Sequence, residues 1–146
     1  MNWKIFAVVI FISIILSTVV YGAYNYYVNI DSTGNVEAVN IEIYWDSERT
    51  NKVENINWGN ISPTETKIVT IFIYNSGSDP VYLQLNSKDW YPIQVEDAMI
   101  LDWNYDNNSI APSKGIFVNI SLTMVQPLED TTISNFNYTT IISAYN

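Results

Sequence analysis

Apolar and polar residues alternate with a period of two along most of this chain, and this pattern limits its fold more than any other feature. No stretch after Tyr27 has the 3.6-residue period of an amphipathic helix. The alternation recurs in stretches separated by turn signals, at residues 39–45, 53–58, 69–74, 81–86, 98–103, 116–124 and 136–143. Seven or eight short strands over about 115 residues predict an all-β fold, an antiparallel two-sheet β-sandwich of immunoglobulin-like size.

Turn-forming residues separate these predicted strands. Gly, Pro, Asn, Asp and Ser cluster at residues 32–35, 62–63, 75–80, 106–109 and 111–113. We therefore expect each of these five segments to be a turn or loop between strands.

An uncharged apolar run precedes the alternating region. Residues 5–20 read IFAVVIFISIILSTVV, with Lys4 as the only charge before the run and Asp31 as the first charge after it. Such a run predicts one N-terminal hydrophobic helix, either a signal peptide or a transmembrane anchor. Lys4 would stay on the cytoplasmic side, so the rest of the chain would be exported. The expected organisation is a signal-anchor segment at residues 1–27 and an extracytoplasmic domain at residues 28–146.

Aromatic residues on both sides of the run favour an uncleaved anchor over a cleaved leader. Tyr and Trp gather where a transmembrane helix meets the bilayer surface. The span from Trp3 to Tyr24 is 21 residue steps, or about 31 Å of helix, which is close to the thickness of a hydrocarbon core. Cleavage stays open as the alternative, because Val20-Tyr21-Gly22 offers small or aliphatic residues. The predicted membrane-interface residues are Trp3, Lys4, Tyr21, Tyr24, Tyr26 and Tyr27.

Composition argues against several classes of function. The chain has no Cys and no His, so it lacks a thiol nucleophile, the commonest general base and the commonest metal ligand. Fifteen acidic residues against six basic ones give a net charge of −9, and Arg49 is the single Arg. Nucleic-acid binding needs a basic surface, so we expect none. We expect neither an enzyme nor a cofactor.

One turn phrase resembles a known class of surface proteins. The residues Trp58-Gly59-x-Ile61-x-Pro63 precede a β run, and Asn75-x-Gly77-x-x-Pro80-x-x-Leu83 follows it. This phrase resembles small exported β-sandwich proteins of archaeal cell surfaces, which implies a hydrophobic N-terminal segment before one sandwich. It is also similar to the camelysin-like, fibre-forming surface proteins, whose exported domains polymerise by strand donation. That second resemblance permits a filament subunit, in which residues 27–30 would form the donated strand after cleavage.

Four sequons of the type Asn-x-Ser/Thr could carry N-linked glycans in an exported protein. Asn107 lies in a predicted turn, and Asn119 and Asn137 lie on the outward side of their predicted strands. The full set of candidate glycosylation sites is Asn60, Asn107, Asn119 and Asn137.

The Trp residues have a regular spacing. Trp45 and Trp58 are 13 positions apart, as are Trp90 and Trp103, and the two pairs are offset by 45 residues. This indicates either an internal duplication or aromatic residues at similar strand ends.

Three kinds of binding surface are compatible with the sequence. Tyr44, Phe72, Tyr74 and Tyr82 fall opposite the aliphatic face of their predicted strands, so neighbouring strands would gather them into an aromatic interaction surface for a protein partner. A glycan-binding module would instead need Trp residues clustered on one exposed patch. A Ca²⁺-dependent adhesion module would need convergent carboxylates, and the candidates are Asp46, Glu48, Asp102 and Asp106.

The leading hypothesis is a non-catalytic β-sandwich tethered to the membrane, with its C-terminal domain outside the cell. It would act by protein–protein contact at the cell surface, as an accessory or assembly subunit. The alternatives are a secreted filament subunit assembled by strand donation, and a glycan-binding or Ca²⁺-dependent adhesion module.

Overall fold

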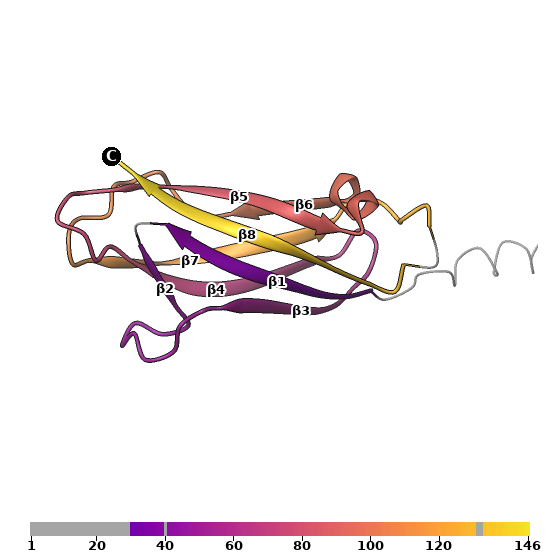
Figure 1. Cartoon of the computed structure of the whole chain (residues 1–146), viewed down its shortest axis with the longest axis horizontal. Coiled ribbons are helices and arrows are strands. Elements are labelled where there is room, and N and C mark those ends of the chain that lie inside the picture. The colour runs from indigo at the N-terminus through magenta and orange to yellow at the C-terminus, as the bar shows by residue number, and fades with distance from the viewer. Residues whose placement is uncertain (1–29, 40, 131–132) are drawn as a thin grey trace, which may run out of the picture.

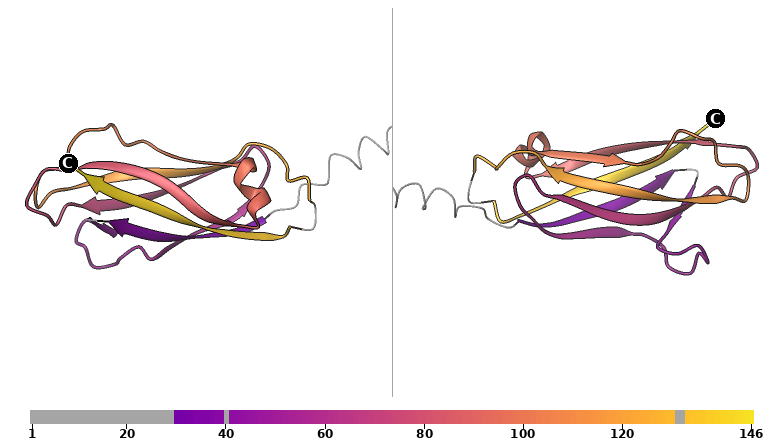
Figure 2. Two further views of the ribbon diagram at one scale, coloured as in Figure 1. Left: turned by 45° about the horizontal axis from the view of Figure 1, so that its top comes forward. Right: turned by 180° about the vertical axis from the view of Figure 1, so that it is seen from behind.

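The described part of the chain forms two β-sheets that face each other (Figures 1 and 2). The computed structural model describes residues 30–39, 41–130 and 133–146. The elements, in chain order, are β1 (Ile30–Val39), β2 (Glu42–Tyr44), β3 (Asn55–Ile61), β4 (Thr66–Tyr74), β5 (Tyr82–Tyr91), the short 3-10 helix η1 (Ile93–Ala98), β6 (Met99–Trp103), β7 (Gly115–Met124) and β8 (Asn135–Tyr145). The prediction of an all-β, two-sheet sandwich is confirmed. The predicted N-terminal helix and the domain boundary at residue 27 lie outside the described residues.

Each sheet contains four strands. Sheet 1 has the order β3-β1-β8-β5, and sheet 2 has the order β2-β4-β7-β6. One pair departs from the expected antiparallel arrangement, because β1 runs parallel to β8. All the other strand pairs are antiparallel. The first and last described strands are therefore neighbours at the centre of sheet 1.

The alternation explains why these segments form strands with one buried face. Along β4 and β7, every second side chain enters the space between the sheets, where Ile71, Ile73, Ile120 and Leu122 have no exposed surface. Strand residues alternate between the two faces of a sheet, so the intervening residues must point outward. Trp90 lies flat against Tyr138 in the same core, with ring centroids 4.1 Å apart. The core thus forms by packing alone, without a disulfide.

The predicted turn at residues 32–35 is wrong, because these residues lie inside β1. They pair with β3 on one side and with β8 on the other, and this double pairing overrides the turn preference of Ser, Gly and Asn. Small side chains are needed here because bulky ones on β3 and β8 lie beneath the strand. A Cβ atom at Gly34 would lie 3.3 Å from the Tyr138 ring and 3.5 Å from Trp58 Nε1.

A buried amide fixes the loops at the end of the sandwich that carries the C-terminus (Figure 1). The Nδ2 group of Asn75 donates hydrogen bonds to the carbonyl oxygens of Asp79 and Ile110. Its Oδ1 atom accepts one from the Gly77 amide. Asn75 thereby joins the loop after β4 to the loop before β7. The opposite end of the sandwich holds η1 and the start of β1.

Candidate functional site

The outward surface of sheet 2 is the strongest candidate for a functional site. We call it the outer face. Its residues are Glu42 and Tyr44 of β2, Thr66, Ile68, Thr70, Phe72 and Tyr74 of β4, Phe117, Asn119, Ser121 and Thr123 of β7, and Ile100 and Asp102 of β6. These side chains share one face because paired residues on neighbouring strands point to the same side of a sheet.

Aromatic side chains form one row across the outer face. Tyr44 pairs with Phe72, and Phe72 pairs with Phe117, so the three residues lie side by side on β2, β4 and β7. The rings of Phe72 and Phe117 are tilted by 56° with centroids 5.0 Å apart. Phe117 is 55% exposed, Phe72 is partly exposed, and Tyr44 is buried with 6% of its surface exposed. The apolar ring surface that the row presents to solvent therefore comes from Phe117 and, in part, from Phe72.

A glycine beside this row leaves the space that the Phe72 ring occupies. Gly115 pairs with Tyr74, next to the pair of Phe72 and Phe117. A Cβ atom at Gly115 would lie 2.7 Å from Cε1 of Phe72 and 2.8 Å from the carbonyl oxygen of Ile73. Only a residue without a side chain leaves room for the ring at this position.

Two basic side chains border the aromatic row. The Arg49 guanidinium lies 4.2 Å from the centre of the Tyr74 ring, and the Lys52 ammonium lies 5.8 Å from that of Tyr44. Both distances are within the range of cation–π attraction. The Tyr44 hydroxyl donates a 2.8 Å hydrogen bond to Glu42, and this bond raises the pKa of Tyr44.

The loop that carries Arg49 and Lys52 is held by Asp46. Its carboxylate accepts hydrogen bonds from the amide and hydroxyl groups of Thr50 and from the amide of Asn51, at 2.9 to 3.1 Å. The bonds from Thr50 and Asn51 lower the pKa of Asp46. Arg49 has a positive φ of 61°, so the loop turns sharply at the residue that covers Tyr74.

The remainder of the outer face combines exposed aliphatic residues with internally paired polar ones. Ile68 is 64% exposed and Ile100 is 52% exposed. The Thr70 hydroxyl donates a 2.7 Å hydrogen bond to Oδ1 of Asn119. The hydroxyl groups of Thr66 and Thr123 are 2.8 Å apart and also form a hydrogen bond. None of the outward residues of β4 and β7 named above carries a formal charge.

Three of the four predicted aromatic residues come together, and the fourth does not. Tyr44, Phe72 and Tyr74 lie on the outer face. Tyr82 lies on β5 in sheet 1, where its ring stacks with Tyr145 at a centroid distance of 5.9 Å. The expectation that their strands are neighbours fails for β5, because the chain crosses to the other sheet after β4.

Sequence analysis did not select the exposed apolar residues that complete the outer face. These residues are Ile68, Ile100 and Phe117. The period-two pattern could have identified Phe117, which alternates with buried Val118. The pattern gives no order of strands, and that order decides which outward residues meet.

The four predicted glycosylation sites all have exposed side chains. Asn60 and Asn137 lie on strands β3 and β8 of sheet 1, and Asn107 lies in the loop after β6. Asn119 alone of the four lies on the outer face, beside Thr70. A glycan at Asn119 would cover the outer face, whereas glycans at the other three positions would leave it open.

The carboxylates proposed for Ca²⁺ do not converge. Asp46 bonds to its own loop, Asp102 accepts from the amide of Trp103, and Asp106 accepts from Asn108. Asn108 lowers the pKa of Asp106. In the part of the chain that the structure describes, no group of three or more acidic residues is placed to hold a metal ion. The Ca²⁺ hypothesis therefore loses the convergence on which it depended.

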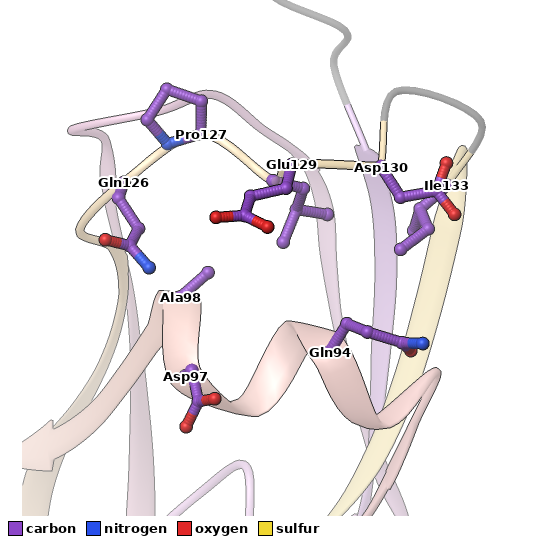
Figure 3. Close-up of a pocket in the computed structure, with 9 residues that line it drawn as sticks. Gln94, Asp97, Ala98, Gln126, Pro127, Glu129, Asp130 and Ile133 are labelled. Carbon is purple, nitrogen blue, oxygen red and sulfur yellow. The ribbon is translucent and has the colours of Figure 1, made fainter.

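A hollow of about 320 Å³ lies between η1 and the segment after β7 (Figure 3). Asp97 lies on the η1 side, and Glu129 and Asp130 lie on the other side. Figure 3 shows these three carboxylates pointing in different directions. The hollow therefore offers no concentrated charge for a ligand.

The Trp residues do not form the exposed patch that a glycan-binding module would need. Trp58 and Trp90 are buried, whereas Trp45 is exposed. The two Trp pairs are also placed differently, since Trp58 lies in sheet 1 and its counterpart Trp103 lies in sheet 2.

The predicted membrane-interface residues, Trp3, Lys4, Tyr21, Tyr24, Tyr26 and Tyr27, lie outside the described residues. A search of the described ranges finds no helix with the length and apolar character to cross a membrane.

Comparison with known proteins gives no match to any protein-family model and no significant match to a curated protein.

Proposed function

We propose that this chain is a non-catalytic, extracytoplasmic β-sandwich, tethered by one N-terminal span, that acts by protein–protein contact at the cell surface. The apolar run at residues 5–20 supports export and tethering. We assign the sandwich to the immunoglobulin-like class because eight short strands in two sheets are typical of it.

The uncharged, partly aromatic outer face is the observation that carries this proposal. The chain is acidic, and charged residues on an exposed sheet surface would favour solubility. The outward side chains of β4 and β7, the two central strands of sheet 2, are nevertheless aliphatic, aromatic or neutral polar. Exposed apolar surface with an aromatic centre and charged residues at its margin is typical of protein interfaces. Glu42 and Asp102 lie at these margins, on the outer strands β2 and β6.

The test uses the full-length chain in membranes and a matched pair of variants. The first variant combines Ile68→Lys with Phe117→Asp, which places charge on the outer face without changing the net charge. The control combines Tyr91→Ser with Ile93→Ser, because these residues are 70% and 62% exposed but lie outside sheet 2. We expect chemical crosslinking to capture a protein neighbour with the native chain and the control, and to lose it with the first variant.

Equal crosslinking by both variants, with native thermal unfolding in each, would contradict the proposed role of the outer face. Both variants change exposed side chains, so their folding should be unaffected.

A second candidate function, assembly by strand donation, is favoured by the position of β1. This strand lies between β3 and β8 and pairs with both. Of its inward residues, Ser32 and Gly34 are small and Val36 packs against the core, so much of its attachment comes from the backbone pairing on both sides. A sandwich without β1 would expose two strand edges, which could accept the equivalent strand of another copy.

A disulfide between β1 and β3 would test strand donation, because the native chain has no Cys. Thr33 and Asn57 are exposed partners in the β1–β3 register. Oxidation of the separated Thr33→Cys, Asn57→Cys monomers, before any assembly, would fix β1 within its own sandwich. We expect these oxidised monomers to form no strand-donated filaments and to form them once a reducing agent is added. Filaments that form from the oxidised, internally crosslinked monomers would exclude donation of β1.

A further inference from the structure

We infer that the outer face binds a second copy of this chain, with the two sheets packed face to face about a two-fold axis parallel to their strands. This inference rests on the proposed function and names the partner of the same surface. Four properties of the outer face favour self-association: its charge, its aromatic row, its internally paired polar residues and its size.

The first property is the absence of formal charge at the centre of the outer face. Two copies that each carry a net charge of −9 repel each other over most orientations. The outward side chains of β4 and β7 carry no formal charge, so face-to-face packing brings no like charges together at its centre. A charged partner protein would find complementary charge only at the margins of the outer face, where both basic and acidic side chains lie, whereas an identical face needs none at the centre.

The aromatic row is the second property. A two-fold axis along the strands, passing between β4 and β7, exchanges the positions of these two strands. Phe72 and Phe117 are paired at the same level of sheet 2. Phe72 of one copy therefore lies against Phe117 of the other, and the reverse contact follows by symmetry. Four rings gather at one level, with Ile68 extending the apolar contact along β4.

The polar residues are the third property. Burial of a hydroxyl or amide group is costly when its hydrogen bonds are lost. The bond from Thr70 to Asn119 and the bond between Thr66 and Thr123 lie within one copy. These groups therefore keep a partner when a second sheet covers them.

The size of the outer face is the fourth property. Nine residues of β4, at about 3.3 Å each, give a length of about 30 Å. Four strands about 4.8 Å apart give a width of about 19 Å. The face therefore offers at most roughly 570 Å² per copy, close to the lower limit for a specific interface. Two chains tethered in one membrane have a raised local concentration, which favours such a weak contact.

The tether also selects the direction of the axis. An axis parallel to the strands leaves the start of β1 at the same end in both copies, so the N-terminal spans of both copies would enter one membrane. An axis across the strands would place the two N-terminal spans at opposite ends of the dimer. The parallel arrangement fits two copies in one membrane.

Cysteine crosslinking between differently tagged full-length chains tests the predicted contact. One chain carries Phe72→Cys, the other carries Phe117→Cys, and the two are expressed together in membranes and treated with a bis-maleimide, because sheets packed face to face lie about 10 Å apart, beyond the reach of a disulfide. The control pair is Tyr82→Cys with Tyr145→Cys, whose native rings stack within one chain on sheet 1. We expect a covalently linked dimer from the first pair and none from the control. No dimer, or equal yields from both pairs, would overturn the inference.

Sedimentation of the full-length chain in mild detergent gives an independent measurement. The Ile68→Lys, Phe117→Asp chain should associate about tenfold or more weakly than the native chain, because it places charge at the centre of the contact. If this variant loses crosslinking to a different protein while the cysteine pairs form no dimer, self-association is wrong and the proposed function stands. If neither contact depends on the outer face, both proposals fall.

Intact mass and peptide mapping supply the remaining outcome. Asn119 lies in the middle of the outer face, so a glycan there would hold two copies apart. A glycan found on Asn119 in the mature protein would overturn the inference. An unmodified Asn119 beside glycans at Asn60, Asn107 or Asn137 would support it.

Discussion

At the scale of single residues, the position of the Phe72 ring on the outer face depends on Gly115, which has no side chain. The Phe72 ring occupies the space next to Gly115, so an added methyl group would overlap the ring and the Ile73 carbonyl. Overpacking of a well-packed site displaces neighbouring side chains and lowers stability.

Gly115→Ala should therefore lower the free energy of unfolding by about 1–3 kcal/mol. Urea unfolding measures this change directly. Adding Phe72→Leu to the same chain should recover part of the loss, because the smaller side chain relieves the contact with the ring. Native stability of the single variant would show that the Phe72 ring moves aside without cost.

A buried tyrosine predicts a loss of stability at high pH. Burial raises the pKa of Tyr138 far above its usual value of 10.0. The folded protein then keeps a proton that the unfolded chain loses, so the contribution is complete below about pH 10 and declines as the pH rises above it. The slope approaches about 1.4 kcal/mol per pH unit for one proton.

Tyr138→Phe should flatten this decline, as measured by urea unfolding between about pH 8 and pH 12. The difference between the two proteins isolates Tyr138, because burial also raises the pKa of Tyr105 and that contribution is common to both. The side chains of Thr140 and Trp58 act to lower the pKa of Tyr138, so burial is the larger of the opposing causes. Identical pH profiles would contradict the assigned cause.

At the scale of elements, the sequence identified most strands but not how they neighbour one another. All seven predicted strands are present, since hydrophobic alternation over four or more residues requires one buried face. Their assignment to sheets was not predictable, because it depends on contacts between residues far apart in the chain. This is why Tyr82 was grouped with Tyr44 and Phe72, although β5 lies in sheet 1.

The strand that sequence analysis missed is β1. Its residues IDSTGNVEAV have turn-forming members and no clear alternation. They form a strand because β3 and β8 pair with them on both sides. Local preference is a weak guide for a strand at the centre of a sheet.

The loop between β2 and β3 predicts a local response to acid. Hydrogen bonds from Thr50 and Asn51 hold the pKa of Asp46 below its usual value of 3.8. The order that these bonds give the loop is present above about pH 4 and is lost as the pH falls through the lowered pKa. The protection of the Thr50 and Asn51 amides against hydrogen exchange, measured relative to the intrinsic rate at each pH, should therefore fall at low pH.

Asp46→Ala should cause the same loss of protection at neutral pH and release Arg49 from the Tyr74 ring. Asp46→Asn keeps one acceptor oxygen and should have an intermediate effect. Exchange in β7, far from the loop in sequence, is the internal control. Unchanged exchange at Thr50 in the alanine variant would exclude Asp46 as the residue that orders the loop.

At the scale of the whole molecule, the two sheets present different surfaces. The outer face of sheet 2 has an uncharged, partly apolar centre. The outward surface of sheet 1 includes the polar residues Lys88, Gln84, Asn57 and Asn137 together with the exposed, stacked rings of Tyr82 and Tyr145. The two sides of the sandwich therefore differ in charge and in the kind of apolar surface that they expose.

Removal of β8 should abolish folding rather than weaken it. This strand lies between β1 and β5, and its inward residues Phe136, Tyr138 and Ile142 belong to the core. A chain ending at residue 134 should show no cooperative thermal transition. A chain that lacks only Asn146 should unfold like the native protein, since Asn146 lies beyond β8 and is exposed. A cooperative transition in the shorter chain would show that sheet 1 closes without β8.

The parallel pairing of β1 with β8 also sets the order of events during biosynthesis. The ribosome makes β1 before the other strands of the sandwich, but a neighbouring strand of β1 is made last. Sheet 1 therefore stays open throughout translation, with its unpaired strand edges accessible to proteases and chaperones. Only a chain that has been synthesised through residues 135–145 can bury them, so a stalled or prematurely terminated product remains open to degradation.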